Sequence, residues 1–569
     1  MKNINKFIAL LILTLTVFSL PLVSAWSDNS SIAQDVDGCN NMNTTGAVYT
    51  LNATIEVPIG ATLSCLIVDA NNITIKLNGF NITGANGAAG YNGIEAVAKR
   101  NITIDGQTGT ISGFGYDSGN GYGIYLSDVN NSIVRNVTST NNSVGVGLMT
   151  ASSNNNKFYN VSIILNKAYG LYLTSNNNTF YTTLISNNGN GLSITLASGA
   201  NVHNNIFYGT TITNSTTDGI ICQDCSENKF YNTLTTLNGR YGLFLDDASD
   251  KNEFQNTISR YNSNTGIYIL DSPDNIFVNT VSNNNSGDGG IYLNGLSTFN
   301  DFTNTTTINN SIHGIYLVGV DGGGDFTGVL STHNLNGITI DGSNGTRIYS
   351  AIITNNTNDG IDITGDDNEI YNLTCYDNTK EIDYTSGTGN ILYYTNAFGY
   401  ILWAIDRDII GRLTFGTGQS IVITSNSAYF NSSSDISELN YTANVGLSGL
   451  STTFLYPRIY KDAVICTDCY NFTSLNAGNV GFNVTSWSDY SIGDGPAPPT
   501  PSACNSFTTS ITYLIPGFLA LAVLIAGGVV FALGFQDNDI KKMIASFVII
   551  ILGLVFIQII AGISITTCF

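Results

Sequence analysis

The chain has 569 residues, of which only 11% are charged, and its formal net charge is −21. Proteins that bind nucleic acid neutralise phosphates with Lys and Arg, so this acidic composition excludes nucleic acid as a main partner. Nine cysteines are present, and in a secreted chain that number predicts disulfides.

The first 25 residues have the pattern of a secretory signal peptide. Lys2 and Lys6 are followed by an apolar run over residues 7–22 and by small residues at 23–25, which predicts cleavage after Ala25. An uncleaved anchor is the alternative, and a run shorter than the ~20 residues of a membrane span disfavours it. In either case we expect the body of the chain to lie outside the cytoplasm.

Residues 26–120 precede the regular part of the chain. Short alternating runs at residues 73–80 and 102–111 are predicted to be the first turns of the fold. The segment 37–75 contains Cys39 and Cys65, and we expect it to form an N-terminal cap that a disulfide between them holds together.

An internal repeat dominates residues 121–389. Glycine followed by alternating aliphatic residues recurs at intervals mostly near 23 residues, and Asn-x-Phe begins a second alternating run in most copies. The eleven copies open at Gly123, Gly145, Gly170, Gly191, Gly219, Gly242, Gly266, Gly290, Gly314, Gly337 and Gly360. A period in the low twenties with two strands and no helical pattern predicts one rung of a parallel β-helix per copy. Leucine-rich repeats are excluded because their fixed leucine frame is absent.

When the rungs stack, the side chain at each position of the repeat points either into the core or outward. The aliphatic residues after glycine are predicted to point inward, as is a series of phenylalanines. This series is Phe158, Phe180, Phe207, Phe230, Phe254, Phe277, Phe302 and Phe326. Rungs lie ~4.8 Å apart, so eleven of them make a rod of about 50 Å.

Aromatic residues also occupy an outward position in successive rungs. These are Phe244, Tyr268, Tyr292 and Tyr316. A similar series on another face is Tyr159, Tyr181, Tyr208 and Tyr231. Exposed aromatic ladders are candidate platforms for sugar rings. The alternative is that the stacked rings only stabilise the sheet.

Acidic residues stand at two positions of three consecutive rungs. They are Asp224, Glu227, Asp247, Asp250, Asp271 and Asp274. Carboxylates stacked ~4.8 Å apart repel each other unless a cation, a basic group or a raised pKa relieves the repulsion. Calcium would suit this oxygen cluster. The alternatives are Asx-turns at a solvated corner and a catalytic patch.

No catalytic motif stands out. The three histidines, His203, His313 and His333, occupy unrelated positions of their rungs, so surface or turn roles are favoured over catalysis. Cys222 and Cys225 are as well explained by a disulfide as by Cys222 acting as a small core residue. Cys375 is predicted to be a buried thiol.

The repeat ends near residue 390. Alternating runs in residues 390–493 predict a β-sandwich-like domain, in which Cys466 and Cys469 are expected to form a disulfide. Zinc is the less favoured reading of that pair, since no further ligands are visible nearby. Residues 494–510 form a Pro-rich linker.

Two apolar stretches follow, at residues 511–535 and 543–566, each long enough to span a bilayer. The loop 536–542 between them carries Lys541 and Lys542, which predicts that it is cytoplasmic. Both ends of this helical hairpin would then lie outside, and we expect a disulfide between Cys504 and Cys568.

Roughly twenty Asn-x-Ser/Thr sequons are scattered over the ectodomain. Among them are those at Asn72, Asn81, Asn101, Asn136, Asn160, Asn372 and Asn483. Because rung turns are exposed, we expect several to carry glycan.

The rungs at residues 266–270 and 275–281, Gly-Ile-Tyr-Ile-Leu and Asn-Ile-Phe-Val-Asn-Thr-Val, resemble the right-handed parallel β-helices of the carbohydrate-binding and sugar-hydrolase superfamily. That superfamily includes NosD-like periplasmic proteins and archaeal surface proteins. The resemblance covers roughly half of the chain and implies an all-β fold. The resemblance says little about activity, because such repeats occur in lyases, hydrolases, epimerases and adhesins.

Two enzyme patterns of that superfamily can be compared with this chain. Polygalacturonase-like members carry Asn-Thr-Asp-Gly, Asp-Asp, Gly-His-Gly and Arg-Ile-Lys. This chain offers residues 217–219 or 358–360 for the first and 246–247 or 366–367 for the second, and it lacks the last two. Pectate-lyase-like members use stacked Asp for calcium and an Arg base, for which Arg240 or Arg260 would be the candidates.

The sequence therefore predicts a membrane-anchored cell-surface protein that binds glycans or acts as an adhesin. The first alternative is a polysaccharide lyase or hydrolase acting on acidic glycans. The second is a structural component of the cell envelope that associates laterally with its own copies. The missing motifs disfavour an enzyme.

Overall fold

The computed structural model describes residues 33–498, except 59–60, 62, 86–90, 118, 197–200, 417–418 and 432–435. The predicted signal peptide, the two predicted membrane helices and the Cys504–Cys568 bridge lie outside these residues. The chain divides into two compact units, Met1–Gly493 and Asp494–Phe569. Within the described ranges, no helix has the length and apolar character needed to cross a bilayer.

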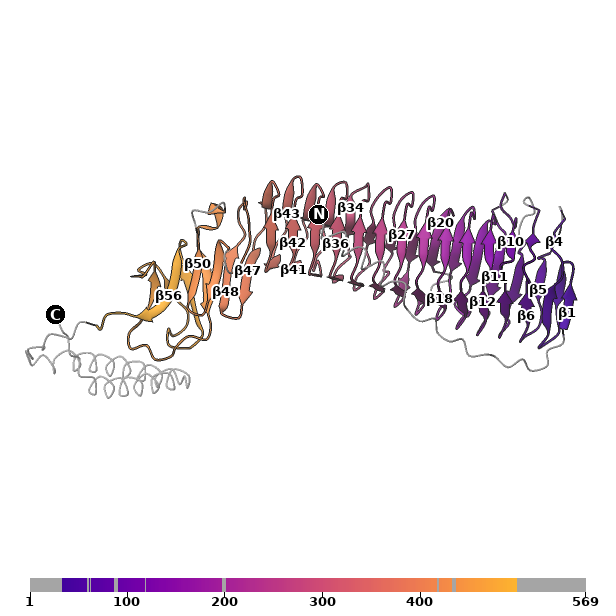
Figure 1. Ribbon diagram of the computed structural model, residues 1–569, viewed down its shortest axis with the longest axis horizontal. Coiled ribbons are helices and arrows are strands. Elements are labelled where there is room, and N and C mark those ends of the chain that lie inside the picture. Colours follow the sequence, from indigo (N-terminus) through magenta and orange to yellow (C-terminus); the bar gives the residue numbers. More distant parts are fainter. Residues whose placement is uncertain are drawn as a thin grey trace, which may run out of the picture. The chain divides into compact units, whose positions relative to one another are not determined.

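Three parallel sheets build the β-helical solenoid of the first unit, and the chain visits them in a fixed cycle, so that each cycle is one rung (Figure 1). The first sheet contains β1 (Ala33–Val36), β3 (Val48–Leu51), β6 (Thr74–Lys76), β9 (Thr103–Asp105), β12 (Ile133–Arg135), β15 (Lys157–Tyr159), β18 (Thr179–Tyr181), β22 (Ile206–Tyr208), β26 (Lys229–Tyr231), β29 (Glu253–Gln255), β32 (Ile276–Val278), β35 (Asp301–Thr303), β38 (Asp325–Thr327), β41 (Arg347–Tyr349), β44 (Glu369–Tyr371) and β47 (Ile391–Asn396).

The second sheet has fifteen strands. They are β2 (Asn40–Met42), β5 (Leu66–Val68), β8 (Ile94–Val97), β11 (Tyr122–Ser127), β14 (Val144–Met149), β17 (Tyr169–Leu173), β20 (Asn190–Thr195), β24 (Ile220–Gln223), β28 (Leu243–Asp246), β31 (Ile267–Leu270), β34 (Gly289–Asn294), β37 (His313–Val318), β40 (Asn336–Asp341), β43 (Asp359–Ile363) and β46 (Lys380–Tyr384). A short pair, β21 (Val202–His203) and β25 (Cys225–Ser226), follows β20 and β24 in sequence.

The third sheet has fourteen strands. They are β4 (Ile55–Glu56), β7 (Ile82–Thr83), β10 (Thr110–Ser112), β13 (Thr138–Thr140), β16 (Ser162–Ile164), β19 (Leu184–Ser186), β23 (Thr211–Thr213), β27 (Leu234–Thr236), β30 (Ile258–Arg260), β33 (Val281–Asn283), β36 (Thr306–Ile308), β39 (Leu330–Thr332), β42 (Ile352–Thr354) and β45 (Thr374–Tyr376). The prediction of an all-β parallel β-helix is thus confirmed.

The interior of the solenoid is built from ladders of identical side chains. The eight phenylalanines from Phe158 to Phe326 are at most 1% exposed, and adjacent ring centroids lie 4.5 to 5.0 Å apart. Their predicted inward direction is confirmed. No rung has a core of its own, because each ring packs between rings of the two neighbouring rungs.

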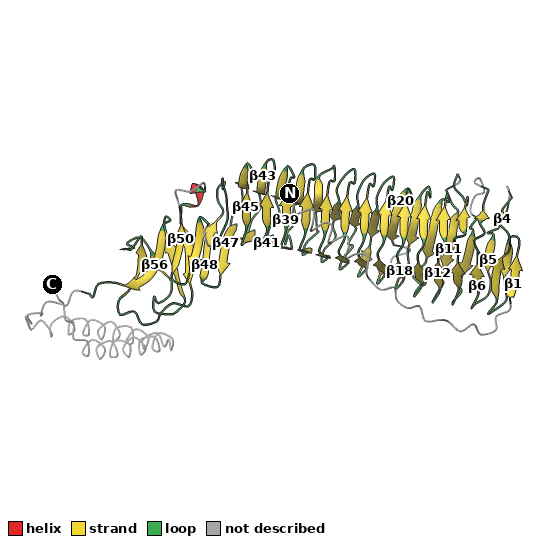
Figure 2. Cartoon of the chain, in the orientation of Figure 1, coloured by secondary structure: helices red, strands yellow, loops and turns green. Residues whose placement is uncertain are grey.

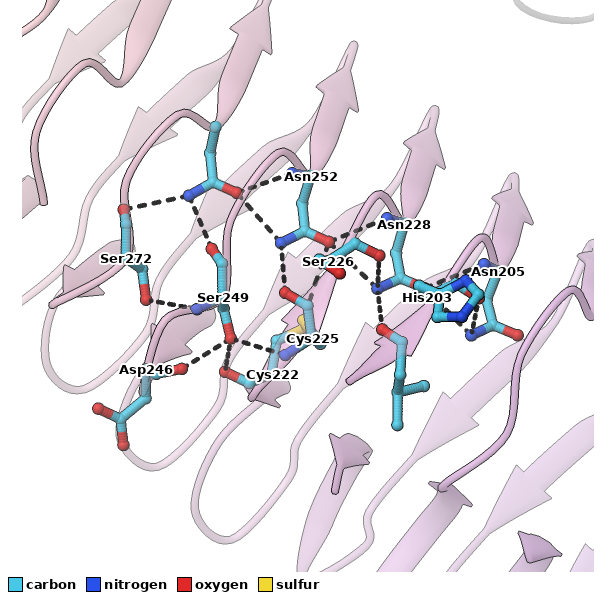
Figure 3. The surroundings of a disulfide bond; sticks show 12 residues. His203, Asn205, Cys222, Cys225, Ser226, Asn228, Asp246, Ser249, Asn252 and Ser272 are labelled. Carbon is cyan, nitrogen blue, oxygen red and sulfur yellow. Dashed lines mark hydrogen bonds between the residues drawn. A yellow bond between two sulfur atoms is a disulfide. The ribbon is translucent and has the colours of Figure 1, made fainter. Parts of the chain in front are cut away.

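Two ladders of buried asparagines run along the solenoid as well. Their side-chain amides form hydrogen bonds with backbone groups at the turns, where no β-sheet hydrogen bonds are available. Asn252 shows the pattern: its Nδ2 donates to the carbonyl of Cys225 and to Oδ1 of Asn275, while its Oδ1 accepts from the backbone N–H of Asn228 (Figure 3). One ladder holds Asn156, Asn178, Asn205, Asn228, Asn252, Asn275 and Asn300, and the other holds Asn238, Asn262, Asn285, Asn310, Asn334, Asn356 and Asn378.

The recurrent glycine of each rung leaves room for the second asparagine ladder. A Cβ atom at Gly242 would lie 2.6 Å from Nδ2 of Asn262, closer than real side chains approach. At the last rung Glu381 stands opposite Gly360, the glycine position of the preceding rung. The chain beyond β46 covers this end with residues 405–415, which form antiparallel bridges from Ile409 to Ile382 and from Leu413 to Cys375.

Residues 391–494 form further strands, as Figure 2 shows, and from β47 onward successive strands of the first sheet pair antiparallel. β48 (Gly399–Ala404), β51 (Ala443–Leu447), β55 (Val480–Val484) and β54 (Tyr470–Asn471) continue the first sheet beyond β47. A separate sheet holds β49 (Ile421–Thr424), β50 (Ser427–Phe430), β56 (Asp489–Asp494), β52 (Pro457–Lys461) and β53 (Val464–Ile465), and a short 3-10 helix spans Ser437–Leu439. The predicted β-sandwich-like region is therefore joined to the solenoid by an unbroken sheet and shares its compact unit.

Candidate functional site

An aromatic stripe, comprising Phe244, Tyr268, Tyr292 and Tyr316, lies on the outer face of the second sheet. The four residues are register partners on β28, β31, β34 and β37. Successive ring centroids are 5.1, 4.8 and 5.0 Å apart, with planes within 14° of parallel. The alternation of inward Ile or Leu with outward aromatic residues along each strand produces this stripe.

Most ring faces of the stripe are covered by the next ring. At the first end, the Arg240 guanidinium lies 5.7 Å from the Phe244 ring centroid. At the other end, His313 stacks on Tyr316 with centroids 4.2 Å apart. A sugar ring cannot insert between aromatic rings spaced at about 5 Å, because the stacked rings are already in van der Waals contact with each other. A ligand on this face can therefore contact only the ring edges and the hydroxyl groups of the stripe.

The hydroxyl groups of the stripe have polar partners. Asn294 Nδ2 donates to Tyr292 Oη at 3.2 Å, and Tyr316 Oη donates to Asp341 Oδ2 at 3.3 Å. Burial raises the pKa of Tyr292 to about 12, and the neighbouring tyrosines add to this shift. The phenols consequently stay protonated at neutral pH and remain available as hydrogen-bond donors and acceptors.

Polar groups extend the stripe toward the C-terminal end of the sheet. Thr339, Asp362 and Asp383 follow Tyr316 in register on β40, β43 and β46. His313 Nδ1 lies 2.8 Å from Thr339 Oγ1, and burial lowers the pKa of this histidine to about 4. Burial also raises the pKa of Asp362 to about 6, and repulsion by Asp383 contributes. A neutral imidazole and a partly protonated carboxyl group thus lie on one face.

An ion pair closes the N-terminal end of the stripe. Arg240 Nε donates to Asp218 Oδ1 at 2.8 Å and its Nη2 donates to Oδ2 at 2.5 Å, while Asp218 is 1% exposed. Both residues appear above as parts of enzyme motifs. Here the charge of each is compensated by the other, and the guanidinium packs over Tyr241 at 4.8 Å.

The second tyrosine series forms an equivalent ladder on the first sheet. Tyr159, Tyr181, Tyr208 and Tyr231 stack with centroid distances of 4.8, 5.2 and 5.1 Å. Its rings stack like those of the stripe but lie on a different sheet, which provides a natural internal control.

Five of the six acidic residues, all except Asp250, have left-handed backbone. Asp224, Asp247 and Asp271 have φ of 49°, 50° and 47° and form one column, in which the N–H of Asp224 donates to the carbonyl of Asp247. Asp and Asn tolerate this region better than most residues, so backbone geometry alone favours them here.

The other acidic column differs from the one that residue counting predicts. Lys251, with φ of 54°, occupies the turn position between Glu227 and Asp274, because Ala248 adds one residue to that rung. Lys251 Nζ lies 2.6 Å from Oδ2 of Asp250. The chain's own ammonium group therefore relieves part of the repulsion in this column. Among the described residues, the six acids do not bring three ligand atoms within 4.8 Å of one another.

The structure confirms the predicted bridges of Cys39 and Cys466 and the buried thiol of Cys375, and of the two alternatives for Cys222 and Cys225 it has the disulfide. Cys39–Cys65, Cys222–Cys225 and Cys466–Cys469 are disulfides, and Cys375 is a buried free thiol. Figure 3 shows the second bridge next to the asparagine ladder. His203 and His333 lie on turns and strand ends outside the stripe.

Sequence reasoning missed Asp341, Asp362 and Asp383, and it favoured a surface or turn role for His313, which instead lies on β37 and stacks on Tyr316. The signal was present: counting the outward position of the stripe three rungs further leads from Tyr316 to Thr339, Asp362 and Asp383. It went unrecognised because the residue type changes from aromatic to acidic.

Comparisons with known proteins give one family match. The model of the family described as periplasmic copper-binding protein (NosD) matches residues 101–286, about a third of the chain. No curated protein matches the chain.

Solved structures with similarity include three carbohydrate-related proteins. The tailspike protein of E. coli bacteriophage HK620 in complex with pentasaccharide has 10% identity and a TM-score of 0.41, covering 81% of this chain and 85% of its own. The Azotobacter vinelandii mannuronan C-5 epimerase AlgE6 A-module has 11% identity and a TM-score of 0.34, covering 63% and 88%. The periplasmic alginate epimerase AlgG has 11% identity and a TM-score of 0.31, covering 60% and 77%.

Proposed function

We propose that this NosD-like parallel β-helix protein acts outside the cytoplasm and binds a linear polysaccharide along the outer face of its second sheet. The aromatic stripe is the observation that carries this proposal. Its three tyrosines offer ring edges and hydroxyl groups at a constant interval of one rung, whereas Phe244 is 7% exposed and has no hydroxyl group. A polymer with a regular repeat of hydroxyl groups and apolar CH edges can meet such a surface at several successive rungs.

The charge of this face indicates the class of polysaccharide. Asp246, Asp341 and Asp362 border the stripe, and its nearest cation, Arg240, is already paired with Asp218. A polyanionic glycan would be repelled by these groups and by the net charge of −21. A neutral or amino-bearing polysaccharide is therefore the expected ligand.

Three disulfides support an extracytoplasmic location, because such bonds persist in oxidising compartments. The cell-surface location, the signal peptide and the anchoring hairpin over residues 511–566 stay part of the proposal. Protease treatment of intact cells tests them: it should remove the described unit and leave a membrane-embedded remainder. Full protection of the described unit would reject the cell-surface location.

Binding can be measured with the full-length protein and soluble polysaccharides that are neutral, amino-bearing or carboxylate-bearing. Tyr268→Ser and Tyr292→Ser should each weaken binding by about tenfold, since a lost ring edge and hydroxyl group remove roughly 1.4 kcal/mol. Tyr159→Ser and Tyr181→Ser, in the ladder on the first sheet, should leave binding unchanged. Equal loss in both ladders would reject the second sheet as the binding face.

A polysaccharide hydrolase is the second candidate, and the raised pKa of Asp362 favours it. A carboxyl group with a pKa of about 6 can donate a proton near neutral pH. Incubation with the same polysaccharides would then shorten their chains, and Asp362→Asn would abolish the shortening while retaining binding. Chains of unchanged length would leave binding as the function.

Lateral self-association is the third candidate. The outer face of the third sheet carries exposed aliphatic residues, including Leu184, Ile258 and Ile352, which are 39%, 37% and 45% exposed. Sedimentation of the full-length protein at increasing concentration tests this proposal, and a constant monomeric mass would reject it.

Calcium also stays a proposal, supported by the column of Asp224, Asp247 and Asp271 in consecutive rungs. If the column binds calcium, the ion should raise the melting temperature through preferential binding to the native state. Asp247→Asn should abolish that rise. Identical melting curves in calcium and in chelator would reject the site.

A further inference from the structure

Two Cys-x-Asp-Cys sequences occur in the chain, at residues 222–225 and 466–469, and each pair of cysteines forms a disulfide. The first pair lies inside the solenoid, where Cys222 and Cys225 are both 0% exposed. The second pair lies between β53 and β54, where Cys466 and Cys469 are partly exposed. The same motif therefore stands in two different environments.

The second motif brings three metal-ligating side chains together. Sγ of Cys466, Sγ of Cys469 and a carboxylate oxygen of Asp468 all lie within 4.8 Å of one another. Sγ of Cys466 is 3.2 Å from Oδ1 of Asp468. The part of the chain that the structure describes contains no other such group of three His, Cys, Asp or Glu side chains, and residues 222–225 do not form one.

The carboxylate of Asp468 is held in place by a second residue. Thr485 Oγ1 donates a hydrogen bond to Oδ2 of Asp468, and this bond lowers the pKa of the carboxyl group. Oδ1 is thereby left directed toward Cys466. Hydrogen bonds of this kind orient carboxylate ligands in metal sites.

We propose that the hairpin over residues 466–469 is a redox-gated site for a borderline divalent cation such as Zn²⁺. Reduction by a dithiol transfers two electrons and two protons to the S–S bond, giving two thiols and the cyclic disulfide of the reductant. The cation then displaces the two thiol protons into solvent and binds two thiolates and the Asp468 carboxylate. Water fills the fourth position, a ligand set that Zn²⁺ accepts.

The disulfide form lacks thiolates and does not bind the cation. The hairpin lies outside residues 101–286, so the family match contributes nothing to this site. It is also independent of the polysaccharide proposal.

Cobalt titration of the full-length protein tests the site. After treatment with a dithiol under native conditions and anaerobic removal of the reductant, Co²⁺ should bind with a thiolate-to-cobalt absorption band, which Zn²⁺ should remove. Cys466→Ser should lose this band. Thr485→Val should weaken Co²⁺ binding about tenfold or more, as loss of an outer partner does in known sites. Untreated protein should show no band.

Alkylation followed by peptide mapping identifies which cysteines were reduced. Cys39 is exposed and its bridge is expected to open as well, so Cys39→Ser provides the matched control and should keep the band. A band that survives in Cys466→Ser would overturn the proposal. So would the absence of a band when mapping finds Cys466 and Cys469 reduced, or resistance of this pair to the dithiol.

Discussion

At the scale of single residues, the direction of a side chain decides its energetic role. Phe254 on β29 and Tyr268 on β31 are both aromatic. Phe254 is 0% exposed and stacks between Phe230 and Phe277, whereas Tyr268 is half-buried on the outer face. Removal of the inward ring would leave an empty cavity, because the close-packed interior has no other group that can fill the space.

Phe254→Ala should therefore lower the free energy of unfolding by about 3 to 5 kcal/mol, the usual cost of an emptied aromatic core position. Tyr268→Ala should cost far less, because water fills the vacated space. Denaturant titration of both variants measures the difference. Equal losses would mean that the inward and outward directions are assigned incorrectly.

Buried amides provide a second test at the residue scale. Asn252→Ala removes partners from the carbonyl of Cys225 and the N–H of Asn228, and each unsatisfied buried group costs about 1 to 3 kcal/mol. The exposed Asn256, which donates to Oδ1 of Asn232, offers the control. Asn256→Gly keeps the left-handed backbone and should change stability little. A larger loss in Asn256→Gly would contradict the role given to the buried ladder.

At the scale of elements, the cap over residues 405–415 ends the solenoid. Glu381 replaces the glycine of earlier rungs, and its Oε2 accepts a hydrogen bond from the N–H of Gly411 at 2.8 Å. No further rung follows β46 in the second sheet, so the longer side chain has space there. Burial raises the pKa of Glu381 from 4.5 to about 7.

This shift predicts a pH dependence of stability. The folded pKa is above the unfolded one, so the contribution of Glu381 is complete below pH 4.5 and is lost as the pH rises through about 7. Asp377 opposes ionisation of Glu381, while Gly411 N–H favours it. Glu381→Gln should flatten the decline in unfolding free energy between pH 4.5 and about 7, measured by denaturant titration. An unchanged slope in Glu381→Gln would assign the decline to other groups, such as Asp362.

At the scale of the whole described unit, the first sheet runs without a break from the solenoid into β48, β51 and β55. Trp403 and Trp487, two of the three tryptophans, contact each other in this C-terminal region with ring centroids 5.1 Å apart. Tryptophan fluorescence therefore reports on the C-terminal strands, while circular dichroism reports mostly on the solenoid.

Unfolding should give coincident transitions by the two probes, because shared sheet hydrogen bonds couple both parts. Guanidinium titration with simultaneous fluorescence and circular dichroism measures this. Trp403→Phe and Trp487→Phe show which signal belongs to which residue. A fluorescence transition that precedes the loss of β-signal would indicate an independent domain over residues 390–493, as the sequence alone predicts.

The fold class, the rung period, the inward phenylalanine ladder and the Cys39–Cys65 and Cys466–Cys469 disulfides were predictable from the sequence alone. These follow from local pattern, because identical residues at a fixed interval must stack when rungs repeat. The outward aromatic stripe was predictable for the same reason.

The remaining features depend on contacts between residues that are distant in sequence, which the folded structure shows. It placed Lys251 rather than Asp250 between Glu227 and Asp274, because one added residue in a turn shifts every later position of a rung. It joined Asp218 to Arg240 and covered the ring faces of the stripe. It also distinguished two identical Cys-x-Asp-Cys motifs, since burial and the direction of a carboxylate depend on neighbours that are distant in sequence.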